Sequence, residues 1–176
     1  MNLIMMAEAF AHGAHNAIGQ KRKYTGEPYT VHLDDVCRRV LSVGGTPEMA
    51  AAALLHDVLE DTQVTEADLR RFFPEEVIEW VVALTDTPKT NGMNRAMRKE
   101  MDRARLAAAP AEVQTIKVAD MISNSHSIIQ HDTHFSVVYM SEKTKLMNVL
   151  KKADPRLVAQ AEQIINNYYH GAKNGQ

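Results

Sequence analysis

The sequence has little cysteine, few aromatic residues and almost no net charge, and two of these scarcities exclude a class of protein. A single cysteine among 176 residues excludes an internal disulfide framework and a four-cysteine zinc site. The formal net charge of −2 argues against a protein whose whole surface binds nucleic acid. Glycine-rich fingerprints of phosphate-binding and dinucleotide-binding loops are also missing. What remains is an ordinary globular composition, 45% hydrophobic and 24% charged.

The sequence also lacks a membrane-spanning segment and a secretory leader. Residues 1–12 are apolar, but they have no basic start, and Glu8 and His12 interrupt them. Crossing a bilayer takes about 20 apolar residues, and a leader needs a cleavage pattern that is absent here. We therefore expect a cytoplasmic protein without a membrane partner, and we expect residues 2–18 to form its first helix.

Along most of the chain, apolar residues recur every three to four positions, which is typical of helices packed on a core. No stretch alternates between apolar and polar residues for long enough to predict a strand. The length suits one domain. We therefore predict an all-α domain of about eight or nine helices over residues 1–176, with its core at about 2–170. One helix is expected to start at Thr46-Pro47 and to continue through Asp61.

The densest group of ionisable residues directly follows the apolar residues 49–55 and reads HDVLED. Ionisable groups at the end of a buried helix are costly unless they are paired or bind a cation. Imidazole and carboxylate together suit Mn, Fe, Co or Zn, and His56 and Asp57 can grip such an ion from two sides. Glu60 shares their helix face and would reach a water at the metal. The alternative is a capped and solvated helix end.

Two further segments carry polar residues on otherwise apolar helices. His32 lies one turn into a predicted helix, and by itself it favours a hydrogen-bonded core histidine. Lys117, Asp120 and Asn124 form a polar stripe on a second helix. Buried polar groups need partners, which a metal would supply for Asp120 and a substrate for Lys117 and Asn124.

The segments RKYTGEPYTVH at 22–32, HDVLEDT at 56–62 and KVADMISN at 117–124 together resemble a known family. They are similar to the HD superfamily of metal-dependent phosphohydrolases, and within it to the hydrolase domain of RelA/SpoT proteins. The resemblance covers about residues 2–170 and is closest to the stand-alone small alarmone hydrolases. It implies a helical HD domain that hydrolyses the 3′-pyrophosphate of guanosine 3′,5′-bis(diphosphate) and of the pentaphosphate.

The resemblance also implies roles for particular residues and a Mn²⁺ cofactor. The family's metal ligands fall on His32, His56, Asp57 and Asp120. Its catalytic pair falls on Glu60 and Asp61. Its nucleotide contacts fall on Arg22, Lys23, Lys117 and Asn124. The sequence departs from the family in two places, both of which concern base and sugar recognition. Leu33 replaces a usual proline, and Met121 and Ser123 stand where basic or aromatic residues are common.

The distribution of charge favours a polyphosphate ligand over nucleic acid. Residues 89–105 contain six basic and two acidic residues, whereas the rest of the chain is net negative. On a helix, Arg95, Arg98 and Lys99 share a face, which is either a solvated surface or part of a substrate site. With Arg22 and Lys23 nearby, Arg98 and Lys99 are expected to bind a multiply charged nucleotide.

Two alternatives stay open. Another HD-type enzyme, such as a nucleoside monophosphate phosphatase, would keep the ligands and Glu60 but need fewer basic residues. An inactive HD module that binds a nucleotide would have lost a ligand or the Glu60–Asp61 pair.

Overall fold

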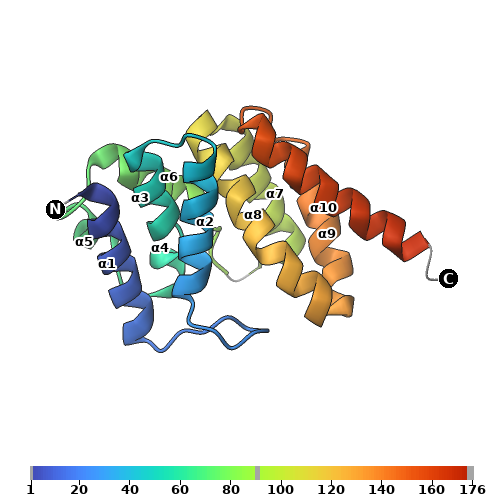
Figure 1. Ribbon diagram of the computed structural model, residues 1–176, viewed down its shortest axis with the longest axis horizontal. Helices are drawn as coiled ribbons and strands as arrows, with labels where there is room; N and C mark the ends of the chain where they lie inside the picture. Colours follow the sequence, from blue (N-terminus) through green and yellow to red (C-terminus); the bar gives the residue numbers. More distant parts are fainter. Residues whose placement is uncertain (1, 90–91, 174–176) are drawn as a thin grey trace.

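The computed structural model describes residues 2–89 and 92–173, and these residues form ten helices (Figure 1). Eight of the helices have nine or more residues, and two are single turns of four. The helices are α1 (Leu3–Ala17), α2 (Thr30–Ser42), α3 (Pro47–Leu55), α4 (Val58–Asp61), α5 (Glu66–Leu69), α6 (Glu75–Leu84), α7 (Arg95–Ala108), α8 (Ala111–His131), α9 (Thr133–Met147) and α10 (Pro155–Lys173). Within the described ranges, the one β-type pairing is the isolated bridge between Lys21 and Pro28. The predicted all-α fold is confirmed.

Short polar side chains define several helix starts. Asn2, Thr46 and Asn94 each accept a hydrogen bond from a backbone N–H in the first turn of the helix that follows. Thr65 and Asp68 form a reciprocal capping box at α5. The predicted start at Thr46, with Pro47 in the first helical position, is confirmed.

The helix expected to run through Asp61 is instead interrupted, and this correction matters for the site. α3 ends at Leu55 and α4 begins at Val58. The His56 ring donates a hydrogen bond from Nδ1 to the Ala53 carbonyl at 2.7 Å. In a continuous helix that carbonyl would accept from the backbone N–H of Asp57. The side chain thus takes the place of a backbone bond, and the chain turns at the His-Asp pair.

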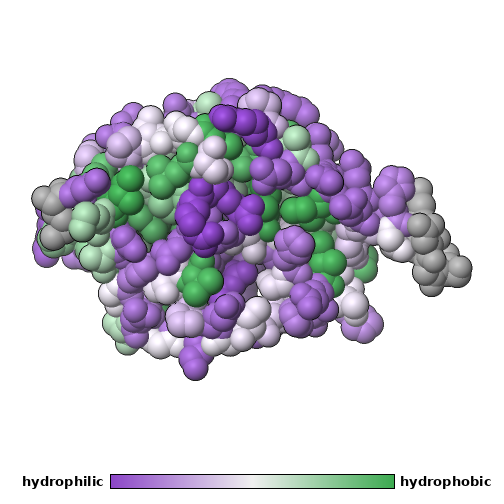
Figure 2. All heavy atoms as spheres, viewed as in Figure 1, coloured by the Kyte–Doolittle hydropathy of each residue, from purple (hydrophilic) through white to green (hydrophobic). Residues whose placement is uncertain are grey.

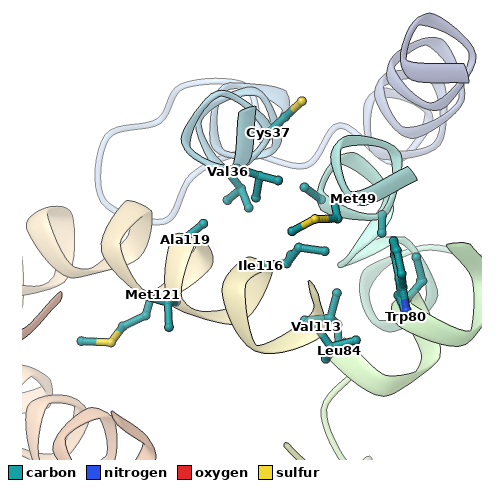
Figure 3. Close-up of a cluster of buried hydrophobic side chains, with 14 of the residues drawn as sticks. Val36, Cys37, Met49, Trp80, Leu84, Val113, Ile116, Ala119 and Met121 are labelled. Carbon is teal, nitrogen blue, oxygen red and sulfur yellow. The ribbon is translucent and has the colours of Figure 1, made fainter. Parts of the chain in front are cut away.

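The hydrophobic core surrounds α3, whose residues 49–55 are all buried. α3 packs against α1, α2, α6 and α8. Figure 3 shows Val36, Met49, Leu84 and Ile116 converging from α2, α3, α6 and α8. The four consecutive alanines of α3 have no exposed surface, and their small side chains let neighbouring helices approach closely.

α8 joins the two parts of the bundle. One side of it packs on α2 and α3, and it also packs against α9 and α10, which extend toward the C-terminus (Figure 1). On the face in Figure 2, hydrophobic side chains form separate patches between hydrophilic ones. No helix in the described part of the chain is both long enough and apolar enough to cross a membrane.

Candidate metal centre and substrate pocket

Four side chains from three parts of the chain converge between α2, the α3–α4 junction and α8. His32 lies in the first turn of α2, His56 and Asp57 at the junction, and Asp120 in the middle of α8. His56 Nε2 lies 2.9 Å from Asp57 Oδ2 and 3.3 Å from His32 Nε2. His32 Nε2 lies 3.4 Å from Asp120 Oδ1. The structure thus brings together the four residues predicted to bind metal.

The histidine rings are oriented by bonds on their far sides. His56 Nδ1 donates to a carbonyl, which can only accept, so in the neutral ring Nε2 is the nitrogen that carries the lone pair. His32 Nδ1 lies 2.9 Å from the Ser123 hydroxyl. The Nδ1 atoms of both rings are therefore engaged, and both Nε2 atoms face the two carboxylates. Two imidazole nitrogens and two carboxylates on such supports fit a divalent metal ion.

The carboxylates of this cluster are held ionised by their surroundings. Burial raises the pKa of Asp57, but the His56 and His32 rings more than offset this and hold it well below its usual range. Asp120 behaves alike, with the Lys117 ammonium as the main opposing charge. Burial lowers the pKa of His56, yet Asp57 and Asp120 together raise it to about 9. The two ionised carboxylates therefore favour a cation at this position, either a proton on His56 or a metal ion that displaces it.

Lys117 and Asn124, expected to contact substrate, both hold Asp120. Asn124 Nδ2 donates to Asp120 Oδ1 at 2.7 Å, and Lys117 Nζ lies 3.0 Å from Oδ2. They lie on α8 one turn after and one turn before Asp120. Both residues also line the pocket beside the cluster, so the clamp does not remove them from reach of a ligand.

Glu60 and Asp61 face the same pocket from α4. Glu60 Oε2 accepts from the Asp86 backbone N–H at 3.2 Å. Partial burial and the carboxylates of Asp86 and Asp57 raise the pKa of Glu60 to about 7. Burial also raises the pKa of Asp61 above its usual value. A carboxylate with a pKa near neutrality is suited to accepting and returning a proton.

Three residues that sequence reasoning missed support this arrangement. The Tyr29 hydroxyl donates to Asp57 Oδ2 at 2.5 Å. Gln20 Nε2 donates to Asp61 Oδ2 at 2.8 Å, and Gln20 Oε1 lies 2.5 Å from Nδ1 of the fully buried His15. Asp61 is therefore positioned by a chain of two polar side chains. The available signal was His15, a polar residue in the last turn of the alanine-rich helix α1.

Basic residues enclose the remaining sides of the pocket, but most of them are paired. Arg22 donates to Asn124 Oδ1 at 2.6 Å, which joins the α1–α2 connection to α8. Lys99 contacts Asp86, and Arg95 forms a two-point ion pair with Glu142. The predicted basic face of α7 therefore exists, but its charges are partly neutralised by acids that the periodicity did not reveal.

The pocket has a volume of about 450 Å³ and is lined by seven basic side chains and five carboxylates. Of the predicted substrate residues, five line it: Arg22, Lys23, Lys99, Lys117 and Asn124. Arg98 instead lines an adjoining depression, which is also lined by Glu60, Asp61 and Lys99. Lys23 is largely exposed and reaches Asp132 at 3.6 Å.

The fold and the site together define a class of protein. It is a helical domain in which two histidines and two aspartates can hold a divalent metal ion beside a basic pocket. Residues 7–164 match the HD domain family, and the chain belongs to that family. The predicted membership of the HD family is confirmed.

Curated relatives carry names of alarmone hydrolases. One is the probable guanosine-3′,5′-bis(diphosphate) 3′-pyrophosphohydrolase of Synechocystis sp., 32% identical over 72% of this chain and 17% of the relative. Another is the enzyme of that activity from Aquifex aeolicus, 31% identical over 69% of this chain and 17% of the relative. The chain thus spans about a sixth of the length of these proteins.

Two solved structures share the fold. One is described as a metazoan ortholog of SpoT that hydrolyzes ppGpp and plays a role in starvation responses. It superposes with a TM-score of 0.83 and 24% identity, over 95% of this chain and 96% of that one. A protein from Listeria monocytogenes EGD-e has a TM-score of 0.69 and 25% identity, over 84% of this chain and 99% of that one.

Proposed function

We propose that this protein hydrolyses the 3′-pyrophosphate of guanosine 3′,5′-bis(diphosphate) and of the corresponding pentaphosphate. The observation that carries the proposal is the contact between a buried His-Asp cluster and a pocket with an excess of basic side chains. The names of the relatives point to the same substrate class. The substrate is a small nucleotide, and neither nucleic acid nor a membrane is a partner.

His32, His56, Asp57 and Asp120 are the metal ligands in this proposal, and Mn²⁺ is the proposed ion. A bound divalent cation supplies a Lewis acid for a phosphate oxygen and lowers the pKa of the attacking water. Tyr29 and Asn124 orient Asp57 and Asp120 through the hydrogen bonds described above.

Glu60 accepts a proton from the water that attacks the phosphorus attached to the 3′-oxygen, and Asp61 orients that water. The new P–O bond forms as the bond from phosphorus to the 3′-oxygen breaks. The 3′-oxygen takes up a proton and becomes a hydroxyl, and pyrophosphate is the other product. Lys117 and Lys99 offset the negative charge of the phosphates during this step, and Arg22 and Lys23 contact the nucleoside end.

The activity is tested by assaying purified protein with Mn²⁺ against a panel of nucleotides. Guanosine and adenosine 3′,5′-polyphosphates are compared with nucleoside monophosphates, and pyrophosphate and orthophosphate are quantified separately. We expect pyrophosphate release from the guanosine 3′-diphosphates. Orthophosphate release from monophosphates would identify the rival phosphatase, and absence of turnover in metal-loaded protein would identify a binding module.

Replacing Gln20 with alanine is expected to lower kcat while leaving KM and metal content nearly unchanged. The Gln20 amide holds Asp61 and touches no predicted ligand. Loss of one hydrogen bond to a charged group corresponds to roughly a tenfold decrease in rate. Steady-state kinetics measure the effect, with Gln63→Ala as the control because Gln63 is exposed outside this pocket. Equal kcat values in the two variants would show that Asp61 needs no such support.

A further inference from the structure

Lys143 of α9 differs from Lys99 and Lys117, which line the same pocket, because it has no acidic partner in the described part of the chain. Within the described residues, no carboxylate oxygen lies within 4.0 Å of its Nζ, whereas Lys99 and Lys117 both contact Asp86. Lys143 nevertheless lines the pocket beside them. Sequence reasoning gave this residue no role.

The surroundings of Lys143 are poor in compensating contacts. Its Nζ lies over the Tyr139 ring, 5.0 Å from the centroid. The charged groups that act on it are Lys117 and Asp120 from α8, Lys99 from α7 and Asp86 from the α6–α7 connection. Burial and the two neighbouring lysines outweigh the two carboxylates and lower the pKa of Lys143 to about 8. A ligand that brings negative charge would relieve this cost.

The position of Lys143 indicates which part of a ligand it meets. Lys143, Lys117 and Lys99 line one depression, and Lys117 contacts Asp120 of the metal cluster. A nucleotide whose reacting phosphorus lies at the cluster would place its next phosphate along this lysine side of the pocket. Arg22 and Lys23 come from the α1–α2 connection, which leaves them for the nucleoside end.

We propose that Lys143 binds the terminal phosphate of the 3′-diphosphate, the half of the pyrophosphate group that is not attacked. The proposal rests on the proposed function for the identity of the nucleotide. It makes Lys143 a specificity residue that distinguishes a 3′-diphosphate from a 3′-monophosphate. The ammonium group donates to an oxygen of that phosphate and stays with the pyrophosphate product until it leaves.

The test compares binding of inorganic pyrophosphate and orthophosphate to protein loaded with one equivalent of Mn²⁺ and freed of excess metal. Lys143→Met is compared with wild type by titration calorimetry. The matched control is Lys145→Met, since Lys145 is an exposed lysine on the same helix and lies outside the pocket. Lys143→Met is expected to bind pyrophosphate about 10- to 100-fold more weakly, the range for one charge-assisted hydrogen bond, and orthophosphate nearly as well as wild type. Lys145→Met is expected to match wild type for both.

Two readouts separate a phosphate contact from a structural role. Lys143→Met is expected to unfold at a temperature no lower than wild type, because the substitution removes a partly buried charge that has no acidic partner among the described residues. Above pH 8, pyrophosphate binding to wild type is expected to take up more protons than binding to Lys143→Met, as measured in buffers of different ionisation enthalpy. Lys143→Arg is expected to recover part of the lost affinity.

Wild-type affinity for pyrophosphate in Lys143→Met would overturn the proposal. So would an equal loss for pyrophosphate and orthophosphate, which would indicate a general field of positive charge. Failure of the proposed function has a different signature. Protein that binds pyrophosphate through Lys143 yet turns over no guanosine 3′-diphosphate would contradict the function and leave the anion site in place.

Discussion

Replacing His56 with alanine is expected to abolish stoichiometric metal binding and, with it, hydrolysis. The substitution removes Nε2, which faces both Asp57 and Asp120, and the other residue of the α3–α4 junction is an aspartate, which has no side-chain nitrogen. Loss of an outer partner of a ligand typically costs ~10–100-fold in metal affinity, and loss of a ligand is expected to cost more. Metal content after dialysis and competition titration with a chelator measure the change. Asp120→Ala is expected to have a similar effect.

The matched control for this variant is His12→Ala. His12 belongs to a second group of possible ligands, together with Glu8 and Asp34, at the surface between α1 and α2. That group is more exposed than the buried cluster. We expect His12→Ala to keep the tight metal site and full activity. If the tight site disappeared in His12→Ala and persisted in His56→Ala, the buried cluster would not be the metal centre.

Glu60→Gln is expected to lower kcat by ~10²–10⁴-fold while metal affinity stays close to that of wild type, as for loss of a general base. Glu60 lies on α4, beyond the four converging side chains, and faces the pocket. Kinetics and metal content are measured on the same preparation. A variant that lost metal, and regained full turnover when metal was resupplied, would make Glu60 a ligand instead of a base.

The pH profile provides a second measure of the same role. Glu60 must be deprotonated to accept a proton, and its pKa is raised to about 7, so kcat/KM should rise with pH up to about 7. A bound cation shifts this limb to lower pH. Asp86→Asn should shift it further in the same direction because the Asp86 carboxylate raises this pKa. Glu60→Gln should lack the limb.

Stability should move in the opposite direction from activity in Glu60→Gln. A carboxyl whose pKa is higher in the folded than in the unfolded state binds more protons when folded, so its ionisation opposes folding as pH rises through about 7. Glutamine cannot ionise. Glu60→Gln is therefore expected to unfold at a temperature equal to or above that of wild type at pH 8, which shows that lost activity does not reflect misfolding.

The helices themselves were predictable because their signals are local. The Thr46–Pro47 start and the apolar periodicity of residues 49–55 depend on neighbours within one or two turns. The break at His56-Asp57 was not predictable, because it arises from a side-chain bond that replaces a backbone bond. A helical pattern by itself cannot reveal that a side chain takes over a backbone hydrogen bond.

The basic helix shows a second limit of local patterns. The face formed by Arg95 and Lys99 follows from their spacing, and both line the pocket. Their partners Glu142 and Asp86 come from α9 and from the α6–α7 connection. Sequence spacing along one helix gives no information about such partners, because the pairing depends on how separate helices pack.

By itself, the sequence determined an all-α chain and the order His, His-Asp, Asp, since periodicity and motif spacing act over a few residues. Only the tertiary structure decided which charges meet. Coulombic and hydrogen-bond interactions depend on distances of a few ångströms between segments that lie far apart in the chain, 102 positions in the case of Arg22 and Asn124. Among the residues that the structure describes, the same packing left Lys143 without an acidic partner while it gave Lys117 two.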